Sequence, residues 1–508
     1  MTADPRRLFW TVLWATLLLK LLLAAWIPLT GDEAYFYLWA SYPAAGYYDH
    51  PPMVGWFLAL LLQFGAAEWW LRLPAVLLST VIGWSIYRLL YRRIEPTTAA
   101  LVATLYLLSP LNLVAVLVTT DTPLILFSFF SALALLLALE RGGYRWFLLS
   151  GVLLGLAFLS KYFAVLLGLA YGIFLLLVRR SGRNALGLLL LFLAVLPFAA
   201  ITLWWNYHHC WDNVLFNLYN RHGGGGAGWS GLLQYLGMML YLITPPLLWY
   251  GWQHRAAFWD RLKGGELFSW LWLLPISLFA LLSFVAVIGL HWVLAFYPFL
   301  FLSLAVLLER RQLRRSITFM AGFSLLHLAL LAVLMLLPLE VWQERQSSIH
   351  YSLVVGMHGD ELWQEIEPLV GERQFATTSY SSSAILEYAT GRRTAVFGDG
   401  SKYGRQDDLL TDFRQLDGRG VAVLLKGRGS SEQFLPYFDE VALHPLKTRD
   451  IDGYLLVGDG FRYDLYRDEV LRRVQQRFYR LPWFLPVGSC YFYDHYFPQQ
   501  DVERLPRK

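Results

Sequence analysis

The chain has 508 residues and a net charge of +5, and 57% of its residues are hydrophobic while 16% are charged. Soluble domains average roughly 45–50% and about 25%, so the composition excludes an ordinary soluble enzyme. No Lys/Arg-rich run with interleaved aromatic residues occurs, which excludes the usual nucleic-acid-binding patterns. Two cysteines are too few for a disulfide framework or a Cys-rich zinc site.

The charged residues divide the chain near residue 339. Residues 1–339 contain 33 charged residues, about 10% of that segment, and residues 340–508 contain 46, about 27%. We therefore expect a membrane domain over residues 1–339 and a soluble domain over residues 340–508.

Apolar stretches long enough to cross a bilayer recur through the first 339 residues, and they predict about eleven transmembrane helices, and up to thirteen. We expect them near 9–28, 70–90, 97–118, 123–140, 145–160, 163–178, 185–204, 231–252, 267–288, 292–308 and 316–338. The first outer loop, about 31–68, contains an apolar stretch over 52–65 that is too short to span and fits an interfacial helix. Lys20 lies inside the first span, where a charge has either a functional role or a structural one in a polar groove.

Lys and Arg residues between the spans indicate the orientation. Alternate loops carry 17 of them, and the remaining loops carry Arg72, Lys161 and Arg221. By the positive-inside rule the first set is cytoplasmic, so residues 340–508 are expected outside. Cys210 and Cys490 then also lie outside, where disulfides persist, and the sequence leaves open whether they pair.

Residues 372–508 show alternating strand-like and helix-like segments, which predict a small α/β domain. Strands are expected at 375–380, 394–398, 420–427 and 453–458, and helices near 383–389, 406–415 and 466–478.

The adjacent acids Asp32 and Glu33 follow the first span directly. Two neighbouring carboxylates at a low-dielectric edge disfavour joint ionisation, which suits one of them to take a proton from a hydroxyl. The structural alternative is that both stabilise the first turn of a helix over 34–40. The residues alone do not decide between these roles.

Two further outer acids lie beside prolines. Asp49 and His50, in YYDHPP, suit a metal ion, a proton transfer or a phosphate, or form a turn before a helix. Asp121, in TTDTP, is either part of a site or the N-cap of the next span.

Outer cations are rare, which makes Lys161 and Arg221 candidates for anion binding. His222 and the four glycines 223–226 follow Arg221, and the glycines favour a flexible hinge or lid. His291 lies at another outer helix end beside Trp292, which fits an interfacial anchor.

These motifs occur in one order along the chain: GDEAYFYLWA, YYDHPPMVGW, TTDTPLILF, GLAFLSKYFAVLL, WWNYHHCWDNVLFNLYNRH and HWVLAFYP. This series, over about residues 8–310, resembles the bacterial branch of the dolichyl-phosphate-mannose protein mannosyltransferase superfamily, which includes the lipid A aminoarabinose transferase. The resemblance implies a GT-C fold: a polytopic α-helical membrane protein, here with an outer α/β domain.

The resemblance further implies an inverting transfer of a sugar from a polyprenyl phosphate to a hydroxyl of lipid A, another lipid, a glycan or a protein. It places this reaction on the periplasmic side of a bacterial inner membrane. No cofactor is required, because the donor is already activated; a divalent metal is left open, with Asp49 and His50 as candidate ligands. The rival interpretation is a transporter or flippase for a lipid-linked sugar.

By position, Asp32 resembles the catalytic base and Glu33 its supporting acid. Lys161, Arg221 and His50 correspond to donor-phosphate contacts, although His50 stands where the aminoarabinose transferase has lysine. Substrate-binding or supporting roles fall to Tyr35, Asp49, Asp121, His222 and His291.

Overall fold

The computed structural model describes residues 4–221, 228–345, 347–428 and 431–505. The chain forms two compact units that are interleaved in sequence. The first unit consists of Met1–Ile27, Phe64–Ala200 and Gly224–Met335, and the second of Pro28–Gln63, Ile201–Gly223 and Leu336–Lys508. The last segment begins close to the expected boundary at residue 339, but its unit also contains two earlier segments, which carry Asp32, Glu33, Asp49 and Asp212.

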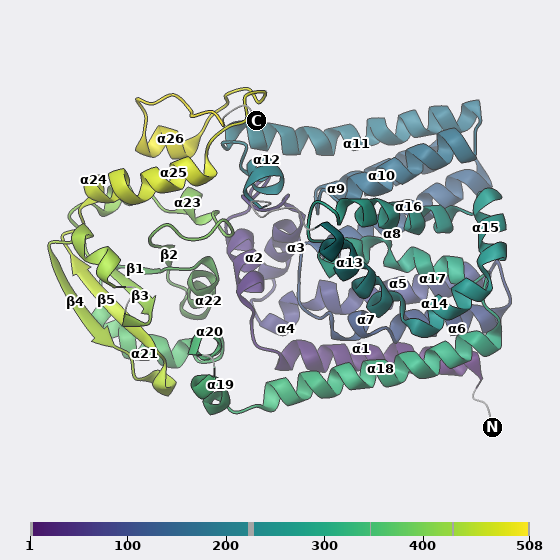
Figure 1. The fold of residues 1–508 in the computed structure, drawn as a ribbon, viewed down its shortest axis with the longest axis horizontal. Coiled ribbons are helices and arrows are strands. Elements are labelled where there is room, and N and C mark those ends of the chain that lie inside the picture. The colour runs from purple at the N-terminus through teal and green to yellow at the C-terminus, as the bar shows by residue number, and fades with distance from the viewer. Residues whose placement is uncertain (1–3, 222–227, 346, 429–430, 506–508) are drawn as a thin grey trace. The chain divides into compact units, whose positions relative to one another are not determined.

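The first unit is built from helices (Figure 1). They are α1 (Pro5–Trp26), α4 (Glu68–Leu71), α5 (Leu73–Tyr91), α6 (Pro96–Leu107), α7 (Pro110–Val114), α8 (Asp121–Arg141), α9 (Tyr144–Phe158), α10 (Ala164–Ile173), α11 (Gly182–His208, which continues into the second unit), α13 (Gly228–Ile243), α14 (Pro245–Gln253), α15 (Arg255–Lys263), α16 (Leu267–Leu282), α17 (Tyr297–Leu304) and α18 (Arg310–Leu336).

The helices confirm a polytopic membrane protein. Among the described residues, five are long and apolar enough to cross a bilayer, or seven if each of two sharply bent pairs is one span. Helices α13 and α14 meet at 90° because Thr244, with φ of +74°, and the prolines that follow it interrupt the backbone hydrogen bonds. Several other expected spans are apolar helices of only 10–17 residues.

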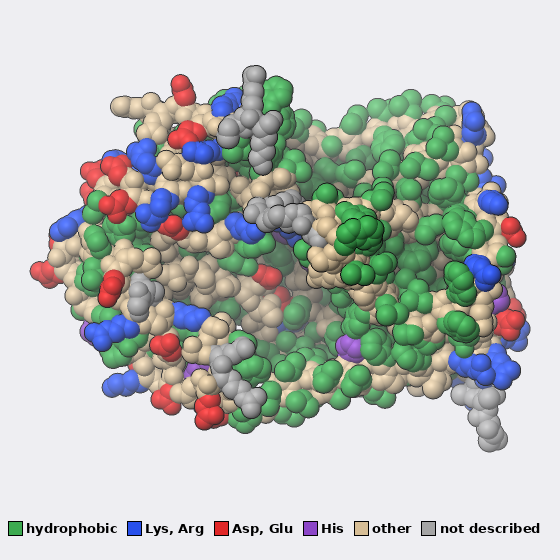
Figure 2. All heavy atoms as spheres, in the orientation of Figure 1, with side chains coloured by type: hydrophobic (Ala, Val, Ile, Leu, Met, Phe, Trp, Pro, Cys, Tyr) green, Lys and Arg blue, Asp and Glu red, His purple; other side chains and the backbone are tan. Residues whose placement is uncertain are grey.

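Apolar side chains cover the outside of the first unit as well as its core. Leu18, Leu22, Leu233 and Leu325 are each at least 60% exposed, and Figure 2 shows hydrophobic side chains over the visible face of these helices, with Lys and Arg gathered at one end. Such a surface is stable against hydrocarbon rather than water.

Two cations of the first unit have structural roles. Lys20 is fully buried, and its ammonium group donates to Val76 O at 2.8 Å, Ser79 Oγ at 2.6 Å and Thr80 Oγ1 at 2.9 Å, so it joins α1 to α5. This is the structural alternative left open by the sequence. The guanidinium of Arg72, also fully buried, donates to Ala24 O and Ile27 O at the end of α1, where the last carbonyls lack helical partners.

The second unit combines short helices with one sheet. Its main elements are α2 (Gly31–Ser41), α3 (Met53–Leu62), α12 (Asp212–Leu215), α19 (Leu339–Arg345), α20 (Ser347–Met357), α21 (Gly359–Val370), β1 (Gln374–Thr377), α22 (Tyr380–Thr390), β2 (Ala395–Val396), α23 (Asp407–Leu410), β3 (Val421–Lys426), β4 (Glu440–Pro445), β5 (Gly453–Asp459), α24 (Tyr463–Tyr466), α25 (Arg472–Phe478) and α26 (Tyr491–Tyr496).

The sheet has the order β2-β1-β3-β5-β4, in which β1 pairs in parallel with β2 and β3, and β5 pairs antiparallel with β3 and β4. The expected α/β domain and its four predicted strands are confirmed. Strand β4 was not predicted, because it is a partly exposed edge strand that ends in Pro445 and has no continuous apolar run.

Helix α2 packs closely against α22. A Cβ added to Gly31 would lie 2.4 Å from Ser381 Cβ, so the two backbones approach at a distance that only glycine permits. The first turn of α2, which carries the acid pair, therefore lies directly on a helix of the sheet domain.

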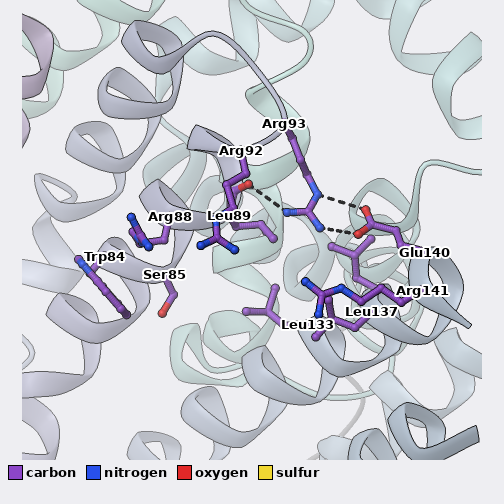
Figure 3. Close-up of a pocket in the computed structure, with 11 residues that line it drawn as sticks. Trp84, Ser85, Arg88, Leu89, Arg92, Arg93, Leu133, Leu137, Glu140 and Arg141 are labelled. Carbon is purple, nitrogen blue, oxygen red and sulfur yellow. Dashed lines mark hydrogen bonds and ion pairs between the residues drawn. The ribbon is translucent and has the colours of Figure 1, made fainter. Parts of the chain in front are cut away.

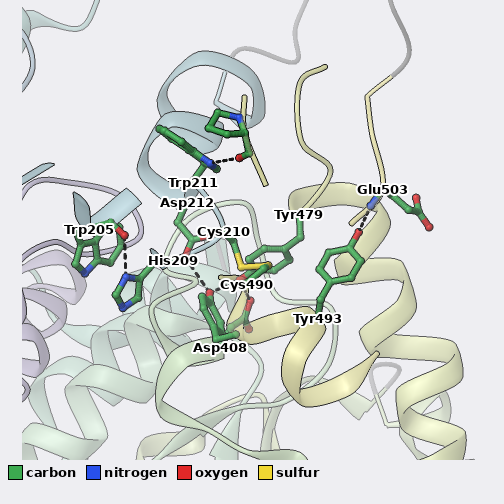
Figure 4. Close-up of a disulfide and its surroundings, with 12 residues drawn as sticks. Trp205, His209, Cys210, Trp211, Asp212, Asp408, Tyr479, Cys490, Tyr493 and Glu503 are labelled. Carbon is green, nitrogen blue, oxygen red and sulfur yellow. Dashed lines mark hydrogen bonds between the residues drawn. A yellow bond between two sulfur atoms is a disulfide. The ribbon is translucent and has the colours of Figure 1, made fainter. Parts of the chain in front are cut away.

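A disulfide joins Cys210 to Cys490, and it resolves the question that the sequence left open (Figure 4). It connects the loop after α11 to the segment before α26, and nearby the Trp211 Nε1–H donates to Pro486 O at 2.8 Å. The described segment over 201–221, which contains the end of α11 and all of α12, is thus covalently attached to the C-terminal part of the same unit.

Candidate active site

The Asp32 side chain is held by a hydrogen bond from Tyr380, a residue of the α/β domain. Asp32 is the second residue of α2 and is exposed, and its Oδ1 accepts a 2.9 Å hydrogen bond from the Tyr380 hydroxyl. Tyr380 begins α22, shortly after the carboxyl end of β1. A carboxylate that is exposed but fixed in orientation is suited to accept a proton from a bound hydroxyl.

Glu33 has a structural position. It is 1% exposed, and its Oε2 accepts from the backbone N–H of Thr30 while the Thr30 hydroxyl accepts from the Glu33 N–H, both at 3.4 Å. This is a capping box at the start of α2. Its effect is to fix the turn that carries Asp32.

Asp49 has a buried carboxyl group, and one of its two oxygens accepts a hydrogen bond. Its Oδ2 accepts from the Gly404 N–H at 3.1 Å, whereas its Oδ1 has no hydrogen-bond partner in the part of the chain that the structure describes. Burial raises the pKa of Asp49 to about 7; the Gly404 hydrogen bond opposes this rise, the charge of Asp32 adds to it, and the charge of Arg221 opposes it. Asp32, Asp49 and Arg221 therefore share one electrostatic environment.

Gly404 connects the two acids. Its φ is +72°, and a Cβ at this position would lie 2.0 Å from Tyr380 Cγ, so its backbone lies against the tyrosine ring. The same residue donates to Asp49, and the tyrosine donates to Asp32. One close contact thus orients the partners of both carboxyl groups.

Tyr35 anchors the loop that contains Gly404. Its buried hydroxyl accepts from the Gln406 N–H at 2.9 Å, and the side-chain Oε1 of Gln406 accepts from the Tyr48 N–H at 2.9 Å. Tyr35 therefore positions the site through the loop at 404–406.

Arg221, His50 and His222 are the cation and the histidines of this unit that the sequence analysis assigned to the site. Arg221 is half-buried and its carbonyl accepts from Lys402 Nζ at 2.9 Å, and His50 is half-buried 6.3 Å from the ring of Trp39. His222 and the glycines 223–226 lie outside the described residues. Within the ranges the structure describes, no group of three or more His, Cys, Asp or Glu side chains is arranged to hold a metal ion.

In the first unit, Asp121 and Lys161 form a buried ion pair. Lys161 Nζ donates to both carboxylate oxygens of Asp121, at 2.9 and 2.8 Å, and the two side chains are 8% and 6% exposed. Asp121 begins α8 without capping it. The sequence analysis considered Asp121 and Lys161 as separate candidates, whereas in the structure they form one ion pair.

An apolar groove of about 380 Å³ is lined in part by α9 and α10, the helices that precede and follow Lys161 in the sequence. Its walls come from α9, α10 and α11, and include Leu154, Phe158, Val165 and Phe192. Lys161 lies in the turn between α9 and α10. His291, also in this unit, is exposed beside Trp292, with ring centroids 6.4 Å apart.

Tyr380 and Gly404 were not predicted from the sequence to belong to the candidate site. Both follow the carboxyl ends of the parallel strands β1 and β2, where α/β sheets commonly place their binding sites. The glycine-rich and charged run GDGSKYGR, directly after β2, was the available signal.

Asp212 is a second buried carboxyl group that was not assigned to the site. Its Oδ2 accepts from the Tyr491 hydroxyl at 3.0 Å, and burial raises its pKa well above the ordinary value. It lies beside the disulfide (Figure 4).

Comparisons with known proteins agree with the expected resemblance. Residues 49–205 match the dolichyl-phosphate-mannose-protein mannosyltransferase family. The lipid A galacturonosyltransferase RgtD of Rhizobium johnstonii is 30% identical over 205 residues, which cover 40% of this chain and 42% of that protein. The matched segment therefore spans less than half the length of this relative.

Two solved structures show the same fold. ArnT from Cupriavidus metallidurans bound to undecaprenyl phosphate is 14% identical, with a TM-score of 0.60 over 88% of this chain and 97% of that one. The apo form of the same protein gives a TM-score of 0.59 with the same identity and coverage. The expected polytopic α-helical fold with an added α/β domain is therefore the fold that this chain shares with ArnT.

Proposed function

We propose that the chain is an inverting glycosyltransferase that moves a sugar from a polyprenyl phosphate to a hydroxyl group of lipid A. The observation that carries the proposal is the exposed Asp32 carboxylate, held by Tyr380 beside the buried carboxyl of Asp49. The similarity to a lipid A galacturonosyltransferase, and the fold shared with an undecaprenyl-phosphate-bound protein, support the donor and acceptor classes.

Asp32 acts as the base in this proposal. The acceptor oxygen attacks the anomeric carbon on the face opposite the phosphate, its proton passes to Asp32, and the bond between the anomeric carbon and the phosphate oxygen breaks. The Tyr380 hydroxyl holds the carboxylate in one orientation, and Glu33 fixes the helix turn beneath it.

The leaving phosphate requires positive charge, because negative charge grows on it as the bond breaks. We assign this role to Lys161, with Arg221 and His50 as further contacts. Lys161 is oriented by Asp121, and the apolar groove lined by α9, α10 and α11 suits part of a polyprenyl chain. Tyr35, Asp49, Asp121, His222 and His291 keep the supporting or substrate-binding roles expected of them.

We also propose an inner-membrane location with about eleven crossings, and with the second unit in the periplasm. The shorter apolar helices and the bent pairs supply the additional crossings beyond the five long helices. The asymmetry of Lys and Arg between loops supports this orientation, as does the disulfide, because disulfides persist in oxidising compartments.

The test is transfer by the purified full chain, with a polyprenyl-phosphate sugar and lipid A as substrates. The wild type should release polyprenyl phosphate and glycosylate lipid A, and Asp32→Asn should lower turnover about 1,000-fold or more while still binding donor and melting at the wild-type temperature. Near-normal turnover by Asp32→Asn would reject the base assignment. Accumulation of the intact donor inside sealed vesicles without transfer would indicate a transporter instead.

A further inference from the structure

A cavity of about 600 Å³ lies between the arginine-bearing ends of α5 and α8 in the first unit (Figure 3). Five charged side chains line it, and four of them are cationic: Arg88, Arg92, Arg93 and Arg141, with Glu140 as the acid. The mechanism proposed above uses none of these residues.

The charges in the cavity are not balanced by the protein. Arg93 forms an ion pair with Glu140, with nitrogen–oxygen distances of 3.1 and 2.5 Å, and it also donates to Leu89 O at 3.1 Å. In the described part of the chain, the exposed guanidinium groups of Arg88, Arg92 and Arg141 form no hydrogen bond or ion pair. Three unneutralised positive charges therefore surround one hollow, and their mutual repulsion would fall if an anion bound there.

The walls of the same cavity are apolar. Leu133, Leu136 and Leu137 of α8 and Leu89 of α5 are half-buried along it, and Trp84, 45% exposed, lies one helical turn below Arg88. Tryptophan at this position is typical of the boundary between headgroups and hydrocarbon. Along α8 the lining thus changes from Leu133 and Leu137 to Arg141 in steps of one helical turn.

We propose that this cavity binds an anionic phospholipid, with the phosphate at Arg88, Arg92 and Arg141 and an acyl chain along the leucines. Guanidinium groups match phosphate oxygens in pairs of hydrogen bonds, and basic pockets between membrane helices bind acidic lipid headgroups. The site takes a bilayer lipid and is separate in sequence from every residue assigned to donor or acceptor, so it does not depend on the proposed reaction.

The experiment measures lipid binding to the purified full chain by native mass spectrometry, with phosphatidylglycerol and phosphatidylcholine of identical acyl chains. Each arginine near an anionic headgroup contributes about 1 kcal/mol, a factor of about 5. The wild type should therefore prefer phosphatidylglycerol by about 10-fold or more, and the triple variant Arg88→Gln, Arg92→Gln, Arg141→Gln should lose this preference.

A matched triple variant separates the cavity from general surface charge. Arg180→Gln, Arg311→Gln and Arg315→Gln remove three exposed arginines of the same unit that do not line the cavity, and this variant should keep the wild-type preference. Equal loss in both triple variants, or no preference in the wild type, would overturn the proposal.

Two further measurements define the ligand. Leu137→Trp, which fills the apolar wall and keeps every arginine, should also weaken phosphatidylglycerol binding, and it serves as the test if the triple arginine variant does not fold. Glycerol 1-phosphate has the charge without the chains, so it should not displace the lipid at equal concentration. Displacement by glycerol 1-phosphate, or unchanged lipid binding in Leu137→Trp, would contradict a phospholipid site.

Discussion

The hydroxyl of Tyr380 donates a 2.9 Å hydrogen bond to Asp32 Oδ1, across 348 residues of sequence. The contact exists because α2 packs on α22 through Gly31 and because the backbone of Gly404 lies against the tyrosine ring. The α/β domain is therefore a structural part of the acid site in the second unit.

Removal of this contact should affect catalysis more than folding. A hydrogen bond to a charged group contributes about 1.5–3 kcal/mol, so Tyr380→Phe should lower kcat about 10-fold or more with little change in KM. Tyr403→Phe, an exposed tyrosine on the loop that contains Gly404, is the control and should retain activity. Wild-type kcat in Tyr380→Phe, or a fall in kcat matched by the Tyr403→Phe control, would contradict the positioning role of Tyr380.

Asp49 should make stability depend on pH. Its pKa is raised from 3.8 to about 7 in the folded chain, so the folded state is favoured while the group is protonated. This stabilisation is complete below about pH 4 and is lost as the pH rises through 7, with a total of about 4 kcal/mol at about 1.4 kcal/mol for each pH unit.

Asp49→Asn removes this dependence. Its melting temperature in detergent should exceed that of the wild type by an amount that grows between pH 4.5 and 7.5 and is constant above that range. Asp501→Asn, at an exposed position, should match the wild type at each pH. A difference between Asp49→Asn and the wild type that did not vary with pH would contradict the burial argument.

Variants of the Lys161–Asp121 ion pair can distinguish an effect on stability from an effect on donor binding. Lys161→Met leaves a buried carboxylate without its partner, which costs about 3–5 kcal/mol, and the double variant Asp121→Asn, Lys161→Met should recover most of this stability. If Lys161 binds the donor phosphate, the stable double variant should still bind polyprenyl phosphate about 10-fold more weakly. Wild-type affinity in the double variant would limit Lys161 to a structural role.

The disulfide should stabilise the second unit and respond to reductant. Cys210 and Cys490 are 280 residues apart, and loss of a disulfide typically costs about 2–5 kcal/mol. The variant Cys210→Ser, Cys490→Ser should melt at a lower temperature than the wild type, and a reductant should lower the wild-type value toward that of the variant. The disulfide would be contradicted if the unreduced wild type contained two free thiols and if reductant did not change its melting temperature.

The sequence by itself determined the features that depend on local pattern. Apolar stretches predicted the membrane helices, and short strand-like runs between helix-like segments predicted β1, β2, β3 and β5. The order of the acidic motifs resembles a glycosyltransferase superfamily in which Asp32 is the expected base. These features are encoded within a few turns or strand residues, because burial in hydrocarbon or in the middle of a sheet requires a local run of apolar residues. Even there, β4 was missed, because this partly exposed edge strand has no continuous apolar run and ends in Pro445.

Only the tertiary structure decided which distant groups meet. It joined Lys161 to Asp121, placed Lys20 among three acceptors, paired the cysteines and brought Tyr380 and Gly404 to the acids. Each of these contacts depends on how helices and loops far apart in sequence pack together, and no local period in the chain records that packing. The acids of the site could therefore be predicted from their motifs, whereas the groups that orient them could not.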